Sequence, residues 1–277
     1  MRRFSVAAIA AITAALAVAG VAFAANQYGL PTASTAPKGT GSPSKPFPTG
    51  VKFGVSVKDS AGPRGAPIEK YRIAFQGLTT KYAKNLPTCK FSDTTADAPL
   101  ATIDQKCKKA KVGSGRVETL VAPEQVNGQP NKNPNDVSFY CNLQLSLYNI
   151  GNGLSIRLDA DNTTQPTSQD GPIGCIVSTH RAIQSKLKSI KIGGVTSSAL
   201  DFTVPLDLRH NSGLVLTVAN ISSTVKKVTG KAKVDGKQRT VGLFSSVACG
   251  KGKKREIQAT FTDETGASSK VSKKTGC

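Results

Sequence analysis

The strongest regularity in the chain is an alternation of apolar and polar residues, and it is clearest at residues 137–148. There Cys141, Leu143, Leu145 and Leu147 all fall on the same side of an extended backbone. Successive side chains of a β-strand point to opposite faces of its sheet. The segment therefore predicts a strand with one face in the protein core.

Similar runs recur along most of the chain, separated by stretches rich in Gly, Pro, Asn and Asp. We expect further strands at residues 51–57, 71–75, 115–121, 154–158, 173–177, 200–205, 214–228, 234–247, 257–262 and 268–274. The segment 149–153, Asn-Ile-Gly-Asn-Gly, predicts a hairpin turn between two of them. Because crossover helices are lacking, the pattern predicts an all-β fold: an antiparallel β-sandwich, either one large or two small, with at most one short helix.

One segment, residues 180–190, has a different periodicity. Ile183, Leu187 and Ile190 recur at i, i+4 and i+7, which is the spacing of one face of an α-helix. We expect the single short helix here. If the chain forms two sub-domains, the Gly193-Gly194 pair that follows is the predicted boundary near residue 193.

The N-terminus has the layout of a secretory signal peptide. Arg2 and Arg3 precede an alanine-rich apolar run that ends in the small-x-small sequence Ala22-Phe23-Ala24, so residues 1–24 are the predicted signal peptide. An uncleaved membrane anchor is the alternative, although the run is short for a spanning helix. Residues 25–49 are rich in Pro, Ser and Thr and predict a disordered leader, which leaves a β-rich domain at 50–277.

All six cysteines lie beyond the predicted signal peptide, and in an oxidising compartment an even number predicts disulfides. About 15 pairings are possible for six cysteines. Loop length and strand placement favour Cys89 with Cys107, Cys141 with Cys175, and Cys249 with Cys277. A zinc site is disfavoured, because no Cys-x-x-Cys motif occurs and the sequence contains only 2 histidines.

The chain is strongly basic, with a formal net charge of +20. Such a charge attracts polyanions of any kind. Export and the scarcity of aromatic residues, 5% with no Trp, make nucleic acid an improbable partner and favour anionic cell-wall or extracellular polymers. From residue 226 to the C-terminus there are 13 Lys and Arg against 4 Asp and Glu. The predicted polyanion-binding residues are Lys226, Lys227, Lys231, Lys233, Lys237, Arg239, Lys251, Lys253, Lys254 and Arg255. The alternative is that these side chains serve solubility and protect strand edges from aggregation.

Catalytic chemistry finds little support in the sequence. His180 and His210 are the only side chains that titrate near neutral pH in their ordinary state, and neither lies in a recognisable catalytic motif. The run Asp159-Ala160-Asp161 could begin a calcium loop, but the Gly and Glu that would complete an EF-hand are lacking, so a solvated turn is favoured. We predict no catalytic residue, no metal site and no cofactor.

Three segments resemble a group of uncharacterised secreted bacterial proteins that have a Pro-rich leader and a Cys-containing β-rich domain. They are the Tyr-x-Ile-x-Phe-x-Gly strand at 71–77, the basic segment at 107–117 and the Cys-x-Leu-x-Leu strand at 141–145. The likeness covers about residues 45–277, with Lys108 in place of a frequent Pro. It implies export and a β-rich fold, and it implies no activity.

These observations lead us to expect a secreted or cell-envelope protein that acts as a non-enzymatic binding module for anionic polymers. The alternative is a structural or protein-interaction β-sandwich that contacts another envelope protein. A hydrolase with an unrecognised site is a third hypothesis.

Overall fold

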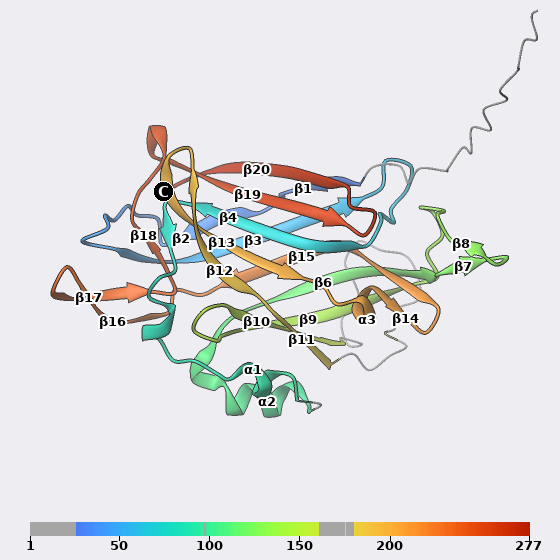
Figure 1. Ribbon diagram of the computed structural model, residues 1–277, viewed down its shortest axis with the longest axis horizontal. Helices are drawn as coiled ribbons and strands as arrows, with labels where there is room; N and C mark the ends of the chain where they lie inside the picture. The colour runs from blue at the N-terminus through green and yellow to red at the C-terminus, as the bar shows by residue number, and fades with distance from the viewer. Residues whose placement is uncertain (1–25, 97, 161–174, 176–179) are drawn as a thin grey trace, which may run out of the picture.

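A computed structural model describes residues 26–96, 98–160, 175 and 180–277, and these residues form two packed β-sheets (Figure 1). The all-β, sandwich-like fold class predicted above is confirmed. The predicted signal peptide at 1–24 and the predicted strand at 173–177, apart from Cys175, lie outside the described residues. Among the described residues no helix is both long enough and apolar enough to cross a membrane.

The larger sheet has eleven strands, whose central pairings are antiparallel. Its main path is β11 (His180–Gln184), β10 (Leu154–Ala160), β9 (Phe139–Asn149), β6 (Lys111–Pro123), β15 (Leu214–Val225), β3 (Phe47–Lys58), β18 (Phe244–Ser246) and β5 (Leu78–Thr79). Three short strands lie off this path: β1 (Gln27–Gly29) and β2 (Ala33–Ala36) pair with β3, and β14 (His210–Asn211) pairs with β15.

The smaller sheet has five strands and packs against the larger one. Its order is β12 (Lys186–Ile192), β13 (Val195–Thr203), β4 (Ile68–Gln76), β19 (Lys254–Asp263) and β20 (Ser268–Gly276). Two-stranded hairpins are formed by β16 (Thr229–Val234) with β17 (Lys237–Gly242) and by β7 (Gln125–Val126) with β8 (Gln129–Pro130). The described helices are short: α1 (Phe91–Thr94), α2 (Leu100–Lys106), α3 (Leu206–Arg209), and the single turns η1 (Ala83–Asn85), η2 (Lys108–Ala110) and η3 (Lys251–Lys253).

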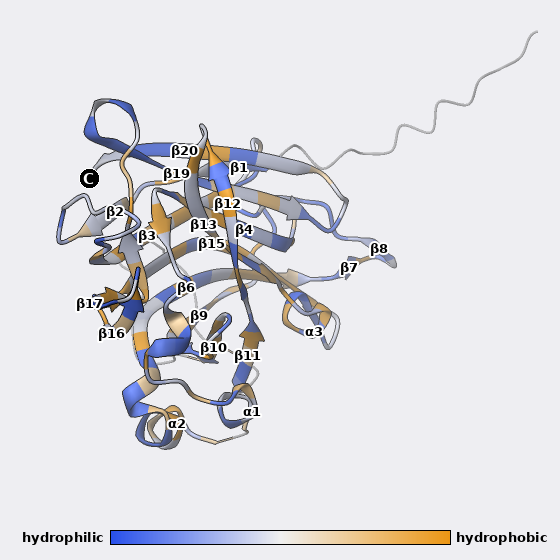
Figure 2. Ribbon diagram, turned by 60° about the vertical axis from the view of Figure 1, so that its left-hand side comes forward, coloured by the Kyte–Doolittle hydropathy of each residue, from blue (hydrophilic) through white to orange (hydrophobic). Residues whose placement is uncertain are grey.

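The apolar positions of the alternating segments form one core between the sheets. Leu143, Leu145 and Leu147 of β9 are buried in the same cluster as Ile73 of β4 and Phe261 of β19. Figure 2 shows the corresponding alternation of apolar and polar colours along these strands. The strand predictions at 51–57, 71–75, 137–148, 154–158 and 257–262 are confirmed.

The predicted helix at 180–190 is wrong. Residues 180–184 form β11 of the larger sheet and residues 186–192 form β12 of the smaller sheet. Ser185 is the point where the chain crosses between them, and its hydroxyl accepts from the Leu154 amide at 2.8 Å. The helix-like spacing of Ile183 and Leu187 arises because both contact the same core from two different strands.

Two predictions about domain organisation are also wrong for the described residues. Residues 26–49 are not a disordered leader, because β1 and β2 extend the sheet beside β3 and the Asn26 side chain accepts from the Ala66 amide at 2.7 Å. Gly193 and Gly194 are not a domain boundary. They form the tight turn between β12 and β13, with φ values of 55° and 78° that glycine adopts readily.

The three predicted disulfides are confirmed. Cys89 is bonded to Cys107, Cys141 to Cys175, and Cys249 to Cys277, with no free cysteine among the described residues. A disulfide of this kind typically stabilises a fold by about 2–4 kcal/mol, chiefly by restricting the unfolded chain. Disulfides persist in oxidising compartments, so this pattern is consistent with an extracytoplasmic location.

The segment that carries α1 and α2 is held to the larger sheet by one buried arginine. The guanidinium of Arg157 donates to the backbone carbonyls of Thr94, Ala96 and Ala98 at 2.7–2.9 Å. The same group forms an ion pair with Asp159 at 2.8 Å, and the Arg157 side chain is fully buried. Every donor is thus directed to a described acceptor, which is the condition under which a buried charge is tolerated.

We therefore expect Arg157→Met to lower the free energy of unfolding by about 3–5 kcal/mol, because Asp159 loses its main countercharge in the interior. Arg181→Met is the matched control. Arg181 pairs with Asp207 on the surface, with exposed side-chain fractions of 59% and 52%, so its loss should cost less than about 1 kcal/mol. Urea denaturation of the two variants measures the difference, and equal losses would contradict the role given to Arg157.

Candidate functional site

The basic residues predicted to bind polyanions lie at one end of the molecule. The β16–β17 hairpin and the β18–β19 loop with the C-terminus are at the same end in both views (Figures 1 and 2). The exposed members of the set are Lys226, Lys227, Lys231, Lys233, Lys237, Lys251, Lys253 and Lys254. None of these eight is within ion-pair distance of a carboxylate of the described residues. We call these eight lysines the basic end.

The β16–β17 hairpin presents its lysines because its other face is apolar. Ala232 and Val234 point inward and form a small buried cluster with Tyr82 and Val241. Lys231 and Lys233 alternate with them and therefore point outward. Arg239, which lies opposite Ala232, is half-buried and contributes less to the exposed charge.

A disulfide and a hydrogen bond fix the second group of lysines. The bond between Cys249 and Cys277 ties the β18–β19 loop to the end of β20. The Cys277 amide also donates to the carbonyl of Lys253 at 3.1 Å. Gly252 adopts φ 70° within the turn, a left-handed conformation that glycine adopts at little cost. The lysines of this loop are thus presented by a backbone held in place.

Arg255 does not join the exposed set, and its assignment to a polyanion-binding surface is wrong. Its side chain is fully buried, because it occupies an inward position of β19. Nη2 donates to the Ser246 hydroxyl at 2.8 Å, whereas Nε and Nη1 have no partner in the described part of the chain. Burial without a countercharge lowers the pKa of Arg255 to about 10.

The two histidines lie in separate hydrogen-bonded networks with carboxylates. His180 Nδ1 is 2.8 Å from the Asp159 carboxylate that also pairs with Arg157. His210 lies between two carboxylates, with Nδ1 3.0 Å from Glu124 and Nε2 2.6 Å from Glu264. Since both ring nitrogens of His210 face carboxylates, this network joins the α3–β14 segment to the β19–β20 turn.

Among the described residues no cluster of three or more His, Cys, Asp or Glu side chains could hold a metal ion. Of the candidate calcium loop only Asp159 and Ala160 fall in the described part, and Asp159 is committed to its ion pair with Arg157 and its hydrogen bond with His180.

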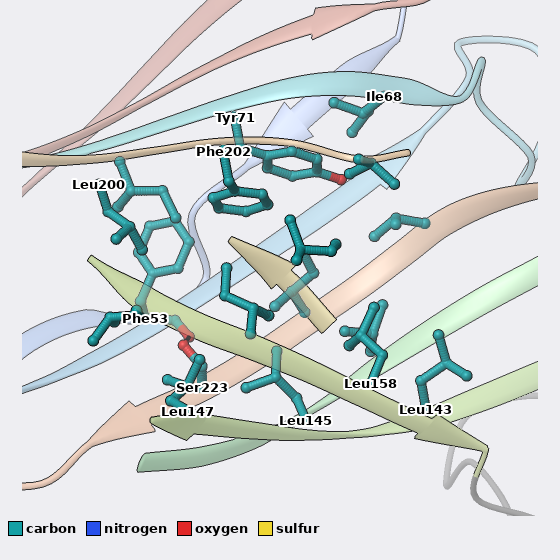
Figure 3. A pocket seen from close by; sticks show the side chains of 18 of the residues that line it. Phe53, Ile68, Tyr71, Leu143, Leu145, Leu147, Leu158, Leu200, Phe202 and Ser223 are labelled. Atoms are coloured by element: carbon teal, nitrogen blue, oxygen red, sulfur yellow. Dashed lines mark hydrogen bonds between the residues drawn. The ribbon is translucent and has the colours of Figure 1, made fainter. Parts of the chain in front are cut away.

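A cavity between the two sheets is a feature that the sequence did not predict. Its volume is about 120 Å³, and its walls are mostly Val, Leu, Ile and Phe side chains of both sheets. Figure 3 shows Tyr71 and Phe202 of the smaller sheet above it and Leu145 and Leu147 of the larger sheet below it. Alternation identifies inward-facing residues such as these, but it does not reveal how far apart the two sheets lie.

Comparison of the chain with protein-family models, with curated proteins and with solved structures found no match in any of them. Function therefore has to be inferred from the geometry of this chain itself.

The burial of Arg255 generates a stability prediction. Arg255→Met should raise the free energy of unfolding by about 1–3 kcal/mol, because a well-packed apolar side chain replaces an unpaired buried charge. Lys254→Met is the control, since Lys254 is exposed and its replacement should change stability by no more than about 0.5 kcal/mol. A destabilised Arg255→Met variant in urea denaturation would show that the guanidinium has an essential partner.

Proposed function

We propose that this protein is a secreted or cell-envelope binding module, without catalytic activity, that attaches to anionic cell-wall or extracellular polymers through its basic end. The observation that carries the proposal is the group of eight exposed lysines without a described carboxylate partner. Uncompensated charges of one sign raise the local concentration of a polymer of opposite sign. The export predicted for the chain makes envelope polymers the relevant polyanions.

The backbone that carries these lysines is held in place, and this supports binding beyond the effect of charge alone. The hairpin is backed by the Tyr82 cluster, and the β18–β19 loop is closed by the disulfide between Cys249 and Cys277. Ordering a flexible side chain or loop on binding costs free energy, so a backbone that is already fixed favours attachment. Neighbouring outward lysines of one strand are separated by about 7 Å, which suits repeated phosphate or carboxylate groups.

Edge protection is a separate role for the lysines of β20. Lys270, Lys273 and Lys274 lie on the outer strand of the smaller sheet, where charged side chains discourage pairing with another sheet. The same role is open to Lys231, Lys233 and Lys237, because β16 and β17 form a two-stranded sheet whose two edges are unpaired among the described residues. It does not explain Lys226, Lys227, Lys251 and Lys253, which lie outside the strands.

We expect the double variant Lys231→Gln/Lys233→Gln to bind polyphosphate or purified wall teichoic acid roughly tenfold more weakly than the unaltered protein at low salt. Binding should also weaken as salt rises from about 0.01 to 1 M, because the screening length falls from about 30 to 3 Å. Isothermal titration calorimetry measures both effects.

Lys58→Gln/Lys70→Gln is the matched control. It removes the same charge from two exposed lysines at the opposite end of the sheets: Lys58 ends β3, whose first residues pair with β18, and Lys70 lies opposite Thr262, at the end of β19 remote from Lys254. Equal weakening in both variants would mean that net charge acts without a site. Absence of binding to either polymer at low salt would favour the alternative of a structural or protein-interaction domain.

A further inference from the structure

The cavity between the sheets has the size and lining of a small-molecule site. Its volume of about 120 Å³ is close to that of an engineered apolar cavity in another protein, of about 150 Å³, which stays dry and binds benzene. Protein interiors normally leave few voids larger than a water molecule. A void of this size therefore forfeits packing contacts that a bound molecule would restore.

One polar group in the wall has no partner. Tyr71 is only 3% exposed, and its hydroxyl makes no hydrogen bond in the described part of the chain. Its ring is fixed by stacking on Phe202 with centroids 4.8 Å apart, and by an edge contact with Phe261. Burial raises the pKa of Tyr71 far above its ordinary value, so the hydroxyl stays protonated and can donate. An unsatisfied buried donor is costly, and a ligand acceptor would remove that cost.

The other polar groups of the wall are already committed or weakly placed. Arg209 donates to the Glu264 carboxylate at 3.0 Å and to the Val204 carbonyl at 3.3 Å. Ser223, seen at the lower wall in Figure 3, donates to the Phe53 carbonyl at 3.5 Å. Among the described residues of the wall, Arg209 is the only charged side chain, and it is already paired, so the cavity suits an uncharged ligand.

The cavity adjoins a second pocket where the two sheets approach without pairing. An outer pocket of about 660 Å³ is lined by residues of β4, β11, β12, β13 and β19. Tyr71, Ile183 and Phe202 line both this pocket and the inner cavity. β11 and β13 belong to different sheets, so no backbone ladder closes the gap between them. Phe202 is only partly buried and belongs to the wall that the two spaces share.

From this geometry we infer that the protein binds a compact, uncharged, largely apolar molecule between its sheets, and that the Tyr71 hydroxyl donates a hydrogen bond to the one acceptor oxygen of that molecule. The size of the cavity limits the ligand to about one aromatic ring or a short branched chain. The inference concerns the interior of the fold and does not depend on the polymer binding proposed above.

Acetophenone and α-methylstyrene form a matched pair of probes, because they have nearly the same shape and only the ketone has an acceptor oxygen. We expect both to bind the full chain and acetophenone to bind about fivefold more tightly. In Tyr71→Phe, which keeps the ring contacts, this preference should disappear while α-methylstyrene binds as before. Ligand-observed NMR titration measures the dissociation constants, and thermal unfolding shows that the variant is folded.

Val117→Phe tests the location, since Val117 is a buried wall residue and the larger ring would fill the space. A folded Val117→Phe variant should bind neither probe, and binding that persists there would overturn the inference. Failure of both probes to bind the unaltered protein would also overturn it, as would equal affinities or a preference for acetophenone that survives in Tyr71→Phe. If Val117→Phe does not fold, the Tyr71→Phe comparison decides alone.

Discussion

The structure depends on the burial of two apolar sheet faces against each other. Each central strand contributes every second side chain to the same core, in which Leu145 of β9 and Val55 of β3 share a cluster with Ile73 and Phe75 of β4. Removing this apolar area from water is the main favourable contribution to folding. The side chains between these core-facing ones point to the outer faces of the sheets, and charged residues are favoured at those outer positions.

The constraint explains the contrasting positions of two arginines. Arg157 is buried but surrounded by acceptors, three of them carbonyls of the segment that carries α1 and α2, so its burial also attaches that segment to the sheet. Arg255 is buried by the alternation of β19, and only its bond to Ser246 is described. A buried arginine therefore stabilises the fold where acceptors surround it, as at Arg157, and destabilises the fold where they do not, as at Arg255.

The two proposed sites follow from the same architecture by different physics. The lysines of the basic end lie on the β16–β17 hairpin, just before it at residues 226–227, and in or next to the disulfide-closed β18–β19 loop. Their interaction with polymers is long-range and screened by salt. The cavity lies where the sheets are held apart, and its interaction with a ligand depends on shape and one hydrogen bond. Each site can therefore be altered without the other.

Local pattern alone determined the strand character of the chain, the inward-facing residues of β9 and the three disulfides, because alternation and loop length are properties of neighbouring residues. The lysines of the basic end were also found from sequence, since exposed charge clusters are visible as composition. Tertiary structure decided the rest. Residues 26–49 are ordered because β3 offers them a paired edge, and residues 180–190 form two strands because Ser185 lies at a crossing between sheets. The burial of Arg255 and the space beside Tyr71 depend on which strands meet and how far apart the sheets stand, and these are distances between segments that are remote in the sequence.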